Sequence, residues 1–314
     1  MLTLFVTLLS AGVYGQSSQL LPVNIYGDGN SENGVEDSRE QVFGGPHNGL
    51  RPGVQYLNSG TIKCDGKVRG TAMVVDTSAY ASDLKGVVIV SAAHVIYDLG
   101  KKRPFKRCDF SFLALGELAS YRARINLKNL RMGGFDPKRA TGSLDFGEGD
   151  WVFLHVPKTW KNFNPDNVIS LREFSWSQME SFQQSGGEFR LIAFDSTAGV
   201  ISISKNCTVL ESDANDLGGG AWRGQLLDDC DSAGGASGGG IVAIEDNSVY
   251  LIGIRSGSHW SEEIFPKSEY PAGPPDGSIW NRHTNTNFGR AVDAHLMREL
   301  AEFVQVLESN HSRF

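Results

Sequence analysis

Short apolar runs typical of β-strands recur along most of the chain and constrain its fold more than any other feature. Gly, Asp, Asn and Ser stand between the runs, and the stretch 157–188 separates two series of them. Regular short strands with turn residues between them favour a sandwich or a barrel over alternating strands and helices. The 37 glycines, against roughly 22 at average usage, fit a fold with many tight turns. The runs cover 70–75, 86–96, 109–115, 121–125, 150–156, 189–194, 199–204, 239–245 and 249–257.

The two ends of the chain differ from this pattern. Residues 2–13 form an apolar run that is too short to span a bilayer, and small residues follow it. This pattern predicts a secretory signal peptide over residues 1–15, although Lys and Arg are missing before the run. Residues 16–52 are polar and predict a propeptide or an N-terminal arm. Residues 291–308 carry apolar side chains at helical spacing, so we expect an amphipathic C-terminal helix there.

Charge and cysteine content narrow the class of protein further. The net charge of −7 argues against a general nucleic-acid binder, and no later segment is apolar enough to span a membrane. The even number of cysteines in an exported chain predicts two disulfides with three possible connectivities. We favour Cys64–Cys108 and Cys207–Cys230, because each pair stays within one half of the chain. No C-x2-4-C spacing supports the rival interpretation, a zinc site.

Residues 234–240 read Gly-Gly-Ala-Ser-Gly-Gly-Gly and precede an apolar run. Glycines around a serine allow a sharp turn that exposes the hydroxyl and lets backbone amides converge on one point. Ser237 is therefore a candidate nucleophile, and the amides of Gly235 and Ser237 are candidates for an oxyanion hole. The alternative is a flexible glycine-rich loop without function.

The same residues match the G-x-S-x-G nucleophile elbow of α/β hydrolases. An elbow leads into a helix, whereas Ser237 is followed by three glycines and a β-type run. The elbow also needs an acid and a histidine after the serine, and the later histidines (His259, His283 and His295) lie in no recognisable context. We therefore disfavour this interpretation.

A histidine that could activate the serine follows an apolar run in VVIVSAAHVI. His94 alone would usually be structural, but the small residues before it suit a tight turn with an accessible ring. The segment SAAHVI resembles the Ala-Ala-His segment of trypsin-like serine peptidases, and GGASGGG resembles their Gly-Asp-Ser-Gly-Gly segment. The order of histidine, acid and serine along the chain also matches. The resemblance covers residues 54–300 and implies a general base at His94 and a nucleophile at Ser237.

The resemblance also implies an acid between the histidine and the serine, at the start of an apolar strand. Asp150 in DWVFLHV fits, because the apolar run begins directly after it, as in the Asp-Ile-Ala-Leu-Leu motif of the family. Asp145 is the second choice. A buried Asp150 would fix the tautomer of the His94 ring and stabilise the imidazolium that forms during reaction.

The fold that the resemblance implies is all-β. We expect two six-stranded antiparallel β-barrels of the chymotrypsin type in a peptidase domain over 53–310. Barrel one would cover about 54–156 and barrel two about 185–290, and the C-terminal helix would follow. The chain is most similar to the bacterial-type branch that includes glutamyl endopeptidases, on CDSAGGASGGG, on CTVL and on residues 25–43.

Two departures from the family concern activation. Ala236 stands where animal trypsins carry the aspartate that pairs with a new N-terminus, and no Arg-Ile-Val-Gly-Gly-like cleavage site is visible. Activation by that salt bridge is not expected here. Gly240 replaces the usual proline, which predicts a more mobile loop with its chemistry retained.

Substrate preference is expected to depend on residues before Ser237 and on the strand around 253–258. Arg255, Ser256 and Gly257 in LIGIRSGSH resemble the Gly-Ile-His-x-Gly-Gly strand of glutamyl endopeptidases, so an Arg255 facing the pocket would favour an acidic P1 side chain. Arg255 could instead point outwards or pair with Asp231 or Glu245. Asp231 in the pocket would favour a basic P1 residue.

These features together predict a secreted, extracellular or periplasmic, monomeric serine endopeptidase that acts on polypeptides through an acyl-enzyme. We expect no cofactor, no required metal, no nucleic-acid partner and no membrane attachment after signal cleavage. The alternative is a catalytically inactive member of the same fold that serves as an extracellular binding protein or adhesin. Inactive relatives usually lose a triad residue, and all three are present in this chain.

Overall fold

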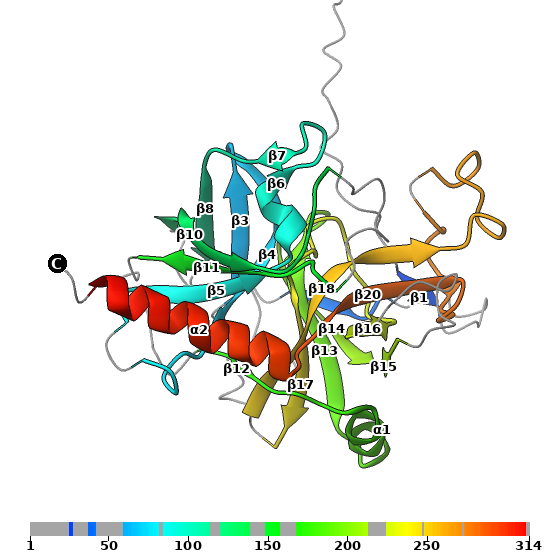
Figure 1. The fold of residues 1–314 in the computed structure, drawn as a ribbon. Coiled ribbons are helices and arrows are strands. Elements are labelled where there is room, and N and C mark those ends of the chain that lie inside the picture. Colours follow the sequence, from blue (N-terminus) through cyan, green and yellow to red (C-terminus); the bar gives the residue numbers. More distant parts are fainter. Residues whose placement is uncertain are drawn as a thin grey trace, which may run out of the picture.

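The computed structural model describes residues 25–27, 37–41, 59–81, 84–113, 120–138, 148–157, 168–212, 224–246, 248–271 and 273–311. The predicted signal peptide, most of the stretch 16–52 and Asp145 lie outside these residues. The described chain forms two barrel-like sheets, whose long strands are antiparallel, and a C-terminal helix (Figure 1). The all-β fold class predicted from the sequence is thereby confirmed.

The first sheet, called barrel one below, has seven strands in the order β10-β11-β5-β4-β3-β8-β9. All of its pairs are antiparallel. Its core contains the Cys64–Cys108 disulfide beside buried aliphatic and aromatic side chains. The strands are β3 (Ser59–Cys64), β4 (Lys67–Val75), β5 (Val87–Ser91), β8 (Cys108–Leu113), β9 (Ser120–Arg124), β10 (Asn126–Met132) and β11 (Val152–Val156).

The second sheet, called barrel two, has nine strands in the order β15-β16-β20-β18-β17-β13-β14-β2, with β12 paired to β18. The counts exceed six per sheet because short edge segments such as β2 and β12 join the longer strands. The second predicted disulfide, Cys207–Cys230, lies in this core. The strands are β2 (Arg39–Gln41), β12 (Ser170–Leu171), β13 (Glu188–Asp195), β14 (Val200–Cys207), β15 (Val209–Glu211), β16 (Gln225–Asp228), β17 (Gly240–Glu245), β18 (Ser248–Trp260) and β20 (Asn285–Ala291).

The remaining elements are short, apart from the C-terminal helix. They are two strand pairs, β1 (Tyr26–Gly27) with β19 (Ser278–Ile279) and β6 (Tyr97–Asp98) with β7 (Arg103–Pro104), the 3-10 turn η1 (Ala93–Ile96), and the helices α1 (Trp176–Gln184) and α2 (Ala294–His311). Helix α1 lies in the stretch that was expected only to connect the barrels, and a capping box between Ser175 and Gln178 begins it. Helix α2 begins three residues later than predicted, because Asp293 accepts from the Leu296 amide at 2.8 Å and caps it.

A shared apolar core joins the two barrels to α2. Met73 and Val90 of barrel one belong to the same buried cluster as Ile192 and Val242 of barrel two. Leu296, Leu300, Phe303, Val304 and Leu307 of α2 complete the cluster, so the helix covers one side of the seam (Figure 1). The two barrels therefore form one packed unit, which fixes the loops at their junction relative to each other.

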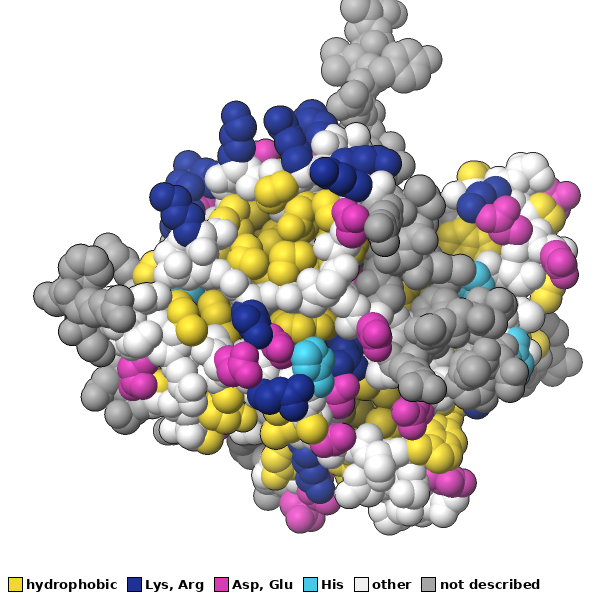
Figure 2. Space-filling view, in the orientation of Figure 1, with side chains coloured by type: hydrophobic (Ala, Val, Ile, Leu, Met, Phe, Trp, Pro, Cys, Tyr) yellow, Lys and Arg dark blue, Asp and Glu magenta, His cyan; other side chains and the backbone are white. Residues whose placement is uncertain are grey.

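Charged side chains are distributed unevenly over the surface. Figure 2 shows Lys and Arg side chains gathered at the end of barrel one, in the region of β6 and β7. The exposed members of this part of the chain are Lys101, Lys102, Arg103, Lys106 and Arg107. The net charge of −7 is therefore not spread evenly over the protein.

Candidate active site

His94 lies in η1, directly after β5, where the small buried residues Ala92 and Ala93 allow the chain to turn tightly. Its backbone amide donates to Oδ1 of Asp150 at 2.9 Å, and its ring Nδ1 lies 2.8 Å from Oδ2 of the same carboxylate. Both oxygens of one aspartate therefore contact one histidine, which fixes the position and the orientation of the imidazole.

The register between β5 and β11 explains why these two residues meet. Val152 pairs with Ser91, so the start of β11 lies beside the end of β5. Asp150 precedes β11 and His94 follows β5, which brings their side chains to the same edge of the sheet. The carboxylate of Asp150 is completely buried, and the His94 side chain is 7% exposed. A buried carboxylate bound to the ring is the arrangement that stabilises an imidazolium.

Ser237 lies on a tight turn between β16 and β17 that packs against barrel one. Gly238 has φ of +81°, and a Cβ added to it would lie 2.1 Å from Oγ of Ser91 and 2.2 Å from the carbonyl oxygen of Thr71. Thr71 in turn donates its amide to the Ser237 carbonyl at 2.7 Å. The serine turn is therefore adjacent to the end of β5, three residues before His94. The Ser237 hydroxyl donates to the carbonyl oxygen of Ser256 at 3.2 Å.

The peptides on both sides of Gly235 are oriented by neighbouring residues. The amide of Ser196 donates to the Gly234 carbonyl at 3.1 Å, and the Thr71 hydroxyl donates to the Gly235 carbonyl at 2.9 Å. In a trans peptide the N–H points away from the C=O, so the Gly235 amide points away from Ser196. Gly235 and Ser237 both line the same small pocket, which is a suitable position for two converging amide donors.

This small pocket lies beside the serine and is formed by β18 and by the segment before Ser237. Its lining residues are Ser232, Ala233, Gly235, Ala236, Ser237, Arg255, Gly257 and Ser258. Of the residues expected to contact substrate, Arg255 and Gly257 line the pocket. Ser256 is adjacent and presents its carbonyl oxygen to the serine hydroxyl. Within the described chain, its own hydroxyl is buried without a hydrogen-bond partner.

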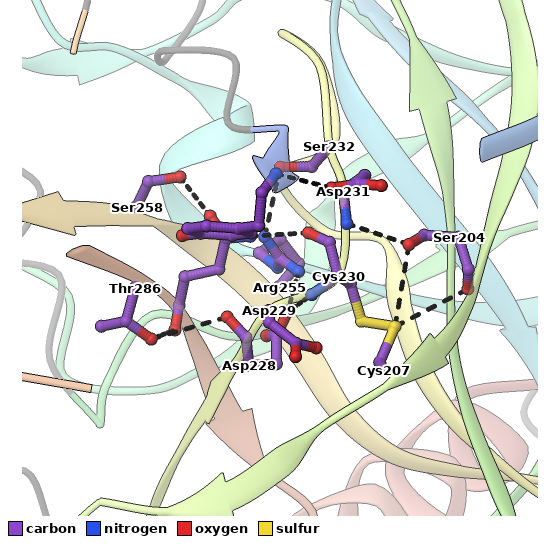
Figure 3. Close-up of polar contacts among 12 residues, drawn as sticks. Ser204, Cys207, Asp228, Asp229, Cys230, Asp231, Ser232, Arg255, Ser258 and Thr286 are labelled. Atoms are coloured by element: carbon purple, nitrogen blue, oxygen red, sulfur yellow. Dashed lines mark hydrogen bonds and ion pairs between the residues drawn. A yellow bond between two sulfur atoms is a disulfide. The ribbon is translucent and has the colours of Figure 1, made fainter. Parts of the chain in front are cut away.

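Arg255 is buried and forms an ion pair with Asp228, the last residue of β16 (Figure 3). Its Nη1 also lies 3.3 Å from Oγ of Ser232. Burial raises the pKa of the Asp228 carboxyl, and the nearby Arg255 charge opposes this shift. Sequence reasoning considered Asp231 and Glu245 as partners of Arg255 and missed Asp228. Glu245 pairs with Arg172 instead.

Asp231, the other residue expected to determine P1 preference, binds the N-terminal segment. It is not among the residues that line this pocket in the described chain, and its carboxylate accepts from the amides of Tyr26 at 2.8 Å and Ser38 at 2.7 Å. Its own amide donates to Oγ of Ser204 (Figure 3). Burial raises the pKa of the Asp231 carboxyl, whereas the amides oppose this shift. Both oxygens of Asp231 are thus bound to the N-terminal segment, and contact of this residue with a basic P1 side chain stays a prediction.

Two other features are absent from the described residues. These residues contain no group of three or more His, Cys, Asp or Glu side chains that could bind a metal ion. No helix among them is long and apolar enough to cross a membrane.

Comparisons with known proteins identify no relative by sequence. No protein-family model matches the chain, and no curated protein matches it. Among solved structures, the chain is similar to a thermostable serine protease, AL20, from an extremophilic microorganism. The similarity has a TM-score of 0.49 at 12% sequence identity and covers 79% of this chain and 97% of that one.

Proposed function

We propose that the protein is a secreted serine endopeptidase in which Ser237 is the nucleophile, His94 the general base and Asp150 the residue that orients the base. The observation that carries this proposal is the double contact of Asp150 with His94, at 2.9 Å from the amide and 2.8 Å from Nδ1. A carboxylate on Nδ1 keeps the proton on that nitrogen, so that Nε2 is the basic nitrogen that accepts a proton in the reaction.

The first step is attack by the Ser237 hydroxyl on a peptide carbonyl carbon. The hydroxyl turns from the Ser256 carbonyl towards His94 Nε2, which accepts its proton as the new C–O bond forms. Rotation also frees the Ser256 carbonyl to accept an amide of the substrate. In structures without substrate such hydrogen bonds are commonly looser than in the reacting complex, which fits the present position of the hydroxyl.

The tetrahedral intermediate carries negative charge on the former carbonyl oxygen. The amides of Gly235 and Ser237 donate to this oxyanion, and removal of one such donor typically costs 10²–10³ in rate. The imidazolium of His94 then protonates the leaving amine, the C–N bond breaks, and an acyl-enzyme remains. Water, deprotonated by His94, attacks the ester and releases the acid product and Ser237.

For substrate preference, we retain the proposal of an acidic P1 side chain bound by Arg255, as in the glutamyl endopeptidase branch. Arg255 lines the pocket, but its charge is compensated by Asp228. A carboxylate in the pocket would have to compete with Asp228 for the guanidinium, so the preference should be moderate. The serine hydroxyls of Ser232 and Ser258 add polar contacts near the same pocket.

The test is covalent labelling by a fluorophosphonate together with casein hydrolysis. Wild-type protein should be labelled once and should degrade casein, whereas Ser237→Ala should lose both properties. Ser248→Ala is the matched control, because this serine is exposed at the start of β18, and it should behave as wild type. Equal labelling of wild type and Ser237→Ala would refute the assignment of the nucleophile.

The alternative is a non-catalytic binding protein with the same fold, and the same experiment detects it. A folded wild-type protein that is neither labelled nor able to cleave any member of a peptide library would support that alternative. Secretion is part of the proposal, and the two disulfides fit an oxidising compartment.

A further inference from the structure

Residues 25–27 and 37–41, called the N-terminal arm below, precede barrel one in the chain but lie on barrel two. Strand β2 is an edge strand on β14, with Arg39 opposite Ser204 and Gln41 opposite Ser202. Strand β1 pairs with β19. Asp231, six residues before Ser237, binds both parts of the arm through the amides of Tyr26 and Ser38. The arm is therefore integrated into the barrel that supplies the nucleophile.

The side chain of Arg39 connects the arm to the turn between β13 and β14. Its guanidinium forms two hydrogen bonds with Asp37, at 2.8 and 2.6 Å, and its Nη1 lies 3.0 Å from Oδ2 of Asp195. The other carboxylate oxygen of Asp195 accepts from the amides of Thr197 at 2.8 Å and Ala198 at 3.1 Å. The shape of the turn 195–199 thus depends on a buried carboxylate whose charge is balanced by Arg39.

The turn contacts the peptide that precedes the nucleophile. The amide of Ser196, next to Asp195, donates to the Gly234 carbonyl at 3.1 Å. The amide of Phe194, on its other side, donates to Oγ1 of Thr71, which itself donates to the Gly235 carbonyl. Gly235 has φ of +93°, and a Cβ there would lie 2.7 Å from the Phe194 ring. Ser196 therefore orients the Gly234–Gly235 peptide directly, and Phe194, through Thr71, orients the peptide that follows it.

We propose that Arg39 is a positioning residue which, through Asp195 and Ser196, keeps the Gly235 amide directed at the oxyanion, so that the N-terminal arm is part of the working enzyme. The inference rests on the proposed function. Without Arg39, the Asp195 carboxylate is a buried charge without its cation, and the turn can relax towards solvent. Ser196 then no longer fixes the Gly234 carbonyl, and the peptide can rotate so that one oxyanion donor is lost.

Arg39→Met tests this directly, because it removes the charge and keeps the length of the side chain. We expect kcat for a peptide ester to fall roughly 10- to 100-fold and KM to change less than threefold, since the oxyanion forms only in the transition state. Arg39→Lys should recover part of the loss, and Asp195→Asn should reproduce it. Glu40→Gln is the matched control, because Glu40 is next on β2 and pairs with Lys205, and it should keep kcat within twofold.

Active-site titration and thermal unfolding accompany the kinetics, so that each rate refers to folded enzyme. If Arg39→Met keeps wild-type kcat per titrated site, or loses no more than Glu40→Gln, the arm contributes only stability and the inference is wrong. A rise in KM at unchanged kcat would also overturn it. A wild-type protein that takes up no fluorophosphonate would instead refute the proposed function, which separates the two failures.

Discussion

The backbone amide of Thr71, on β4, donates a 2.7 Å hydrogen bond to the carbonyl oxygen of Ser237, which barrel two supplies. The carbonyl of Thr71 accepts from Oγ of Ser91 at 2.7 Å, and its hydroxyl bridges Phe194 and Gly235. One residue of barrel one therefore fixes the end of β5 and the serine turn at the same time. Its position explains how the packing of two sheets becomes the geometry of one site.

Replacing Thr71 by valine should be costly although the shapes are similar. The change leaves the Gly235 carbonyl and the Phe194 amide without their partner, and one buried unsatisfied group costs about 1–3 kcal/mol. We expect the free energy of unfolding to fall by roughly 3 kcal/mol and kcat to fall with it. Thr71→Ser keeps the hydroxyl and serves as the control. Urea unfolding gives the free energy of unfolding of both variants. Equal values for the valine and serine variants would contradict the argument.

Asp150→Asn tests the orienting role proposed for the carboxylate. An amide donates or accepts at fixed positions, so it stabilises the wrong tautomer of His94 and cannot balance an imidazolium. We expect kcat to fall about 10⁴-fold and KM to change little, as for the equivalent change in a Ser-His-Asp triad. Asp76→Asn, directly after β4, is the control and should retain activity. A kcat within tenfold of wild type would remove Asp150 from the mechanism.

Gly238→Ala separates steric exclusion from backbone preference when it is compared with Gly199→Ala. Both glycines have positive φ, +81° and +74°, but a Cβ at Gly199 meets nothing within 4 Å. Gly199→Ala should therefore cost only the left-handed backbone penalty, about 1–2 kcal/mol. Gly238→Ala should cost more than about 4 kcal/mol, because the added Cβ would clash with backbone atoms of barrel one, which are held in the sheet and cannot move aside. Similar melting temperatures for the two variants would show that the serine turn is not packed as described.

Asp228→Asn should change substrate preference if Arg255 contacts the P1 side chain. The wild-type carboxylate competes for the guanidinium, and the amide competes less. We expect the ratio of kcat/KM for P1 glutamate over P1 leucine to rise roughly tenfold. A ratio of two kcat/KM values is independent of the fraction of enzyme that is folded. Glu245→Gln, which breaks the ion pair with Arg172, is the control and should leave the ratio unchanged. An unchanged ratio would show that Arg255 does not read the P1 residue.

Asp229 makes stability depend on pH in the mildly acidic range. Burial raises the pKa of its carboxyl from 3.8 to about 6, against the hydrogen bond from the Thr208 amide. Between about pH 4 and 6 the Asp229 carboxyl binds more protons in the folded state than in the unfolded state. The contribution of Asp229 to stability therefore falls as pH rises from about 4 to 6 and stays low above that range. Asp229→Asn should therefore increase the free energy of unfolding at pH 8 by up to about 3 kcal/mol, with a corresponding rise in Tm. Near pH 4 the substitution should have little effect. A gain in Tm that is the same at both pH values would contradict this.

The sequence predicted the strands whose apolar side chains indicate a buried position. Strands such as β5, β11, β13 and β17 are mainly apolar, and they lie where the runs indicated. Strands β10 and β20 were missed because their sequences, NLKNLRM and NTNFGRA, are largely polar. In β20 those polar side chains are buried among hydrogen-bond partners from barrel two, a property that is not visible in a single sequence.

For the candidate site, local sequence determined what each residue could be and tertiary structure decided what each one contacts. The glycines around Ser237, the small residues before His94 and the apolar run after Asp150 are local requirements of turns and strands, so they could be read directly. The partners of Arg255 and Asp231 depend on which distant segments meet, and Asp231 binds amides about two hundred positions away in the chain. Any buried charge needs a partner, but only the folded chain decides which of several acids or amides is near enough to serve.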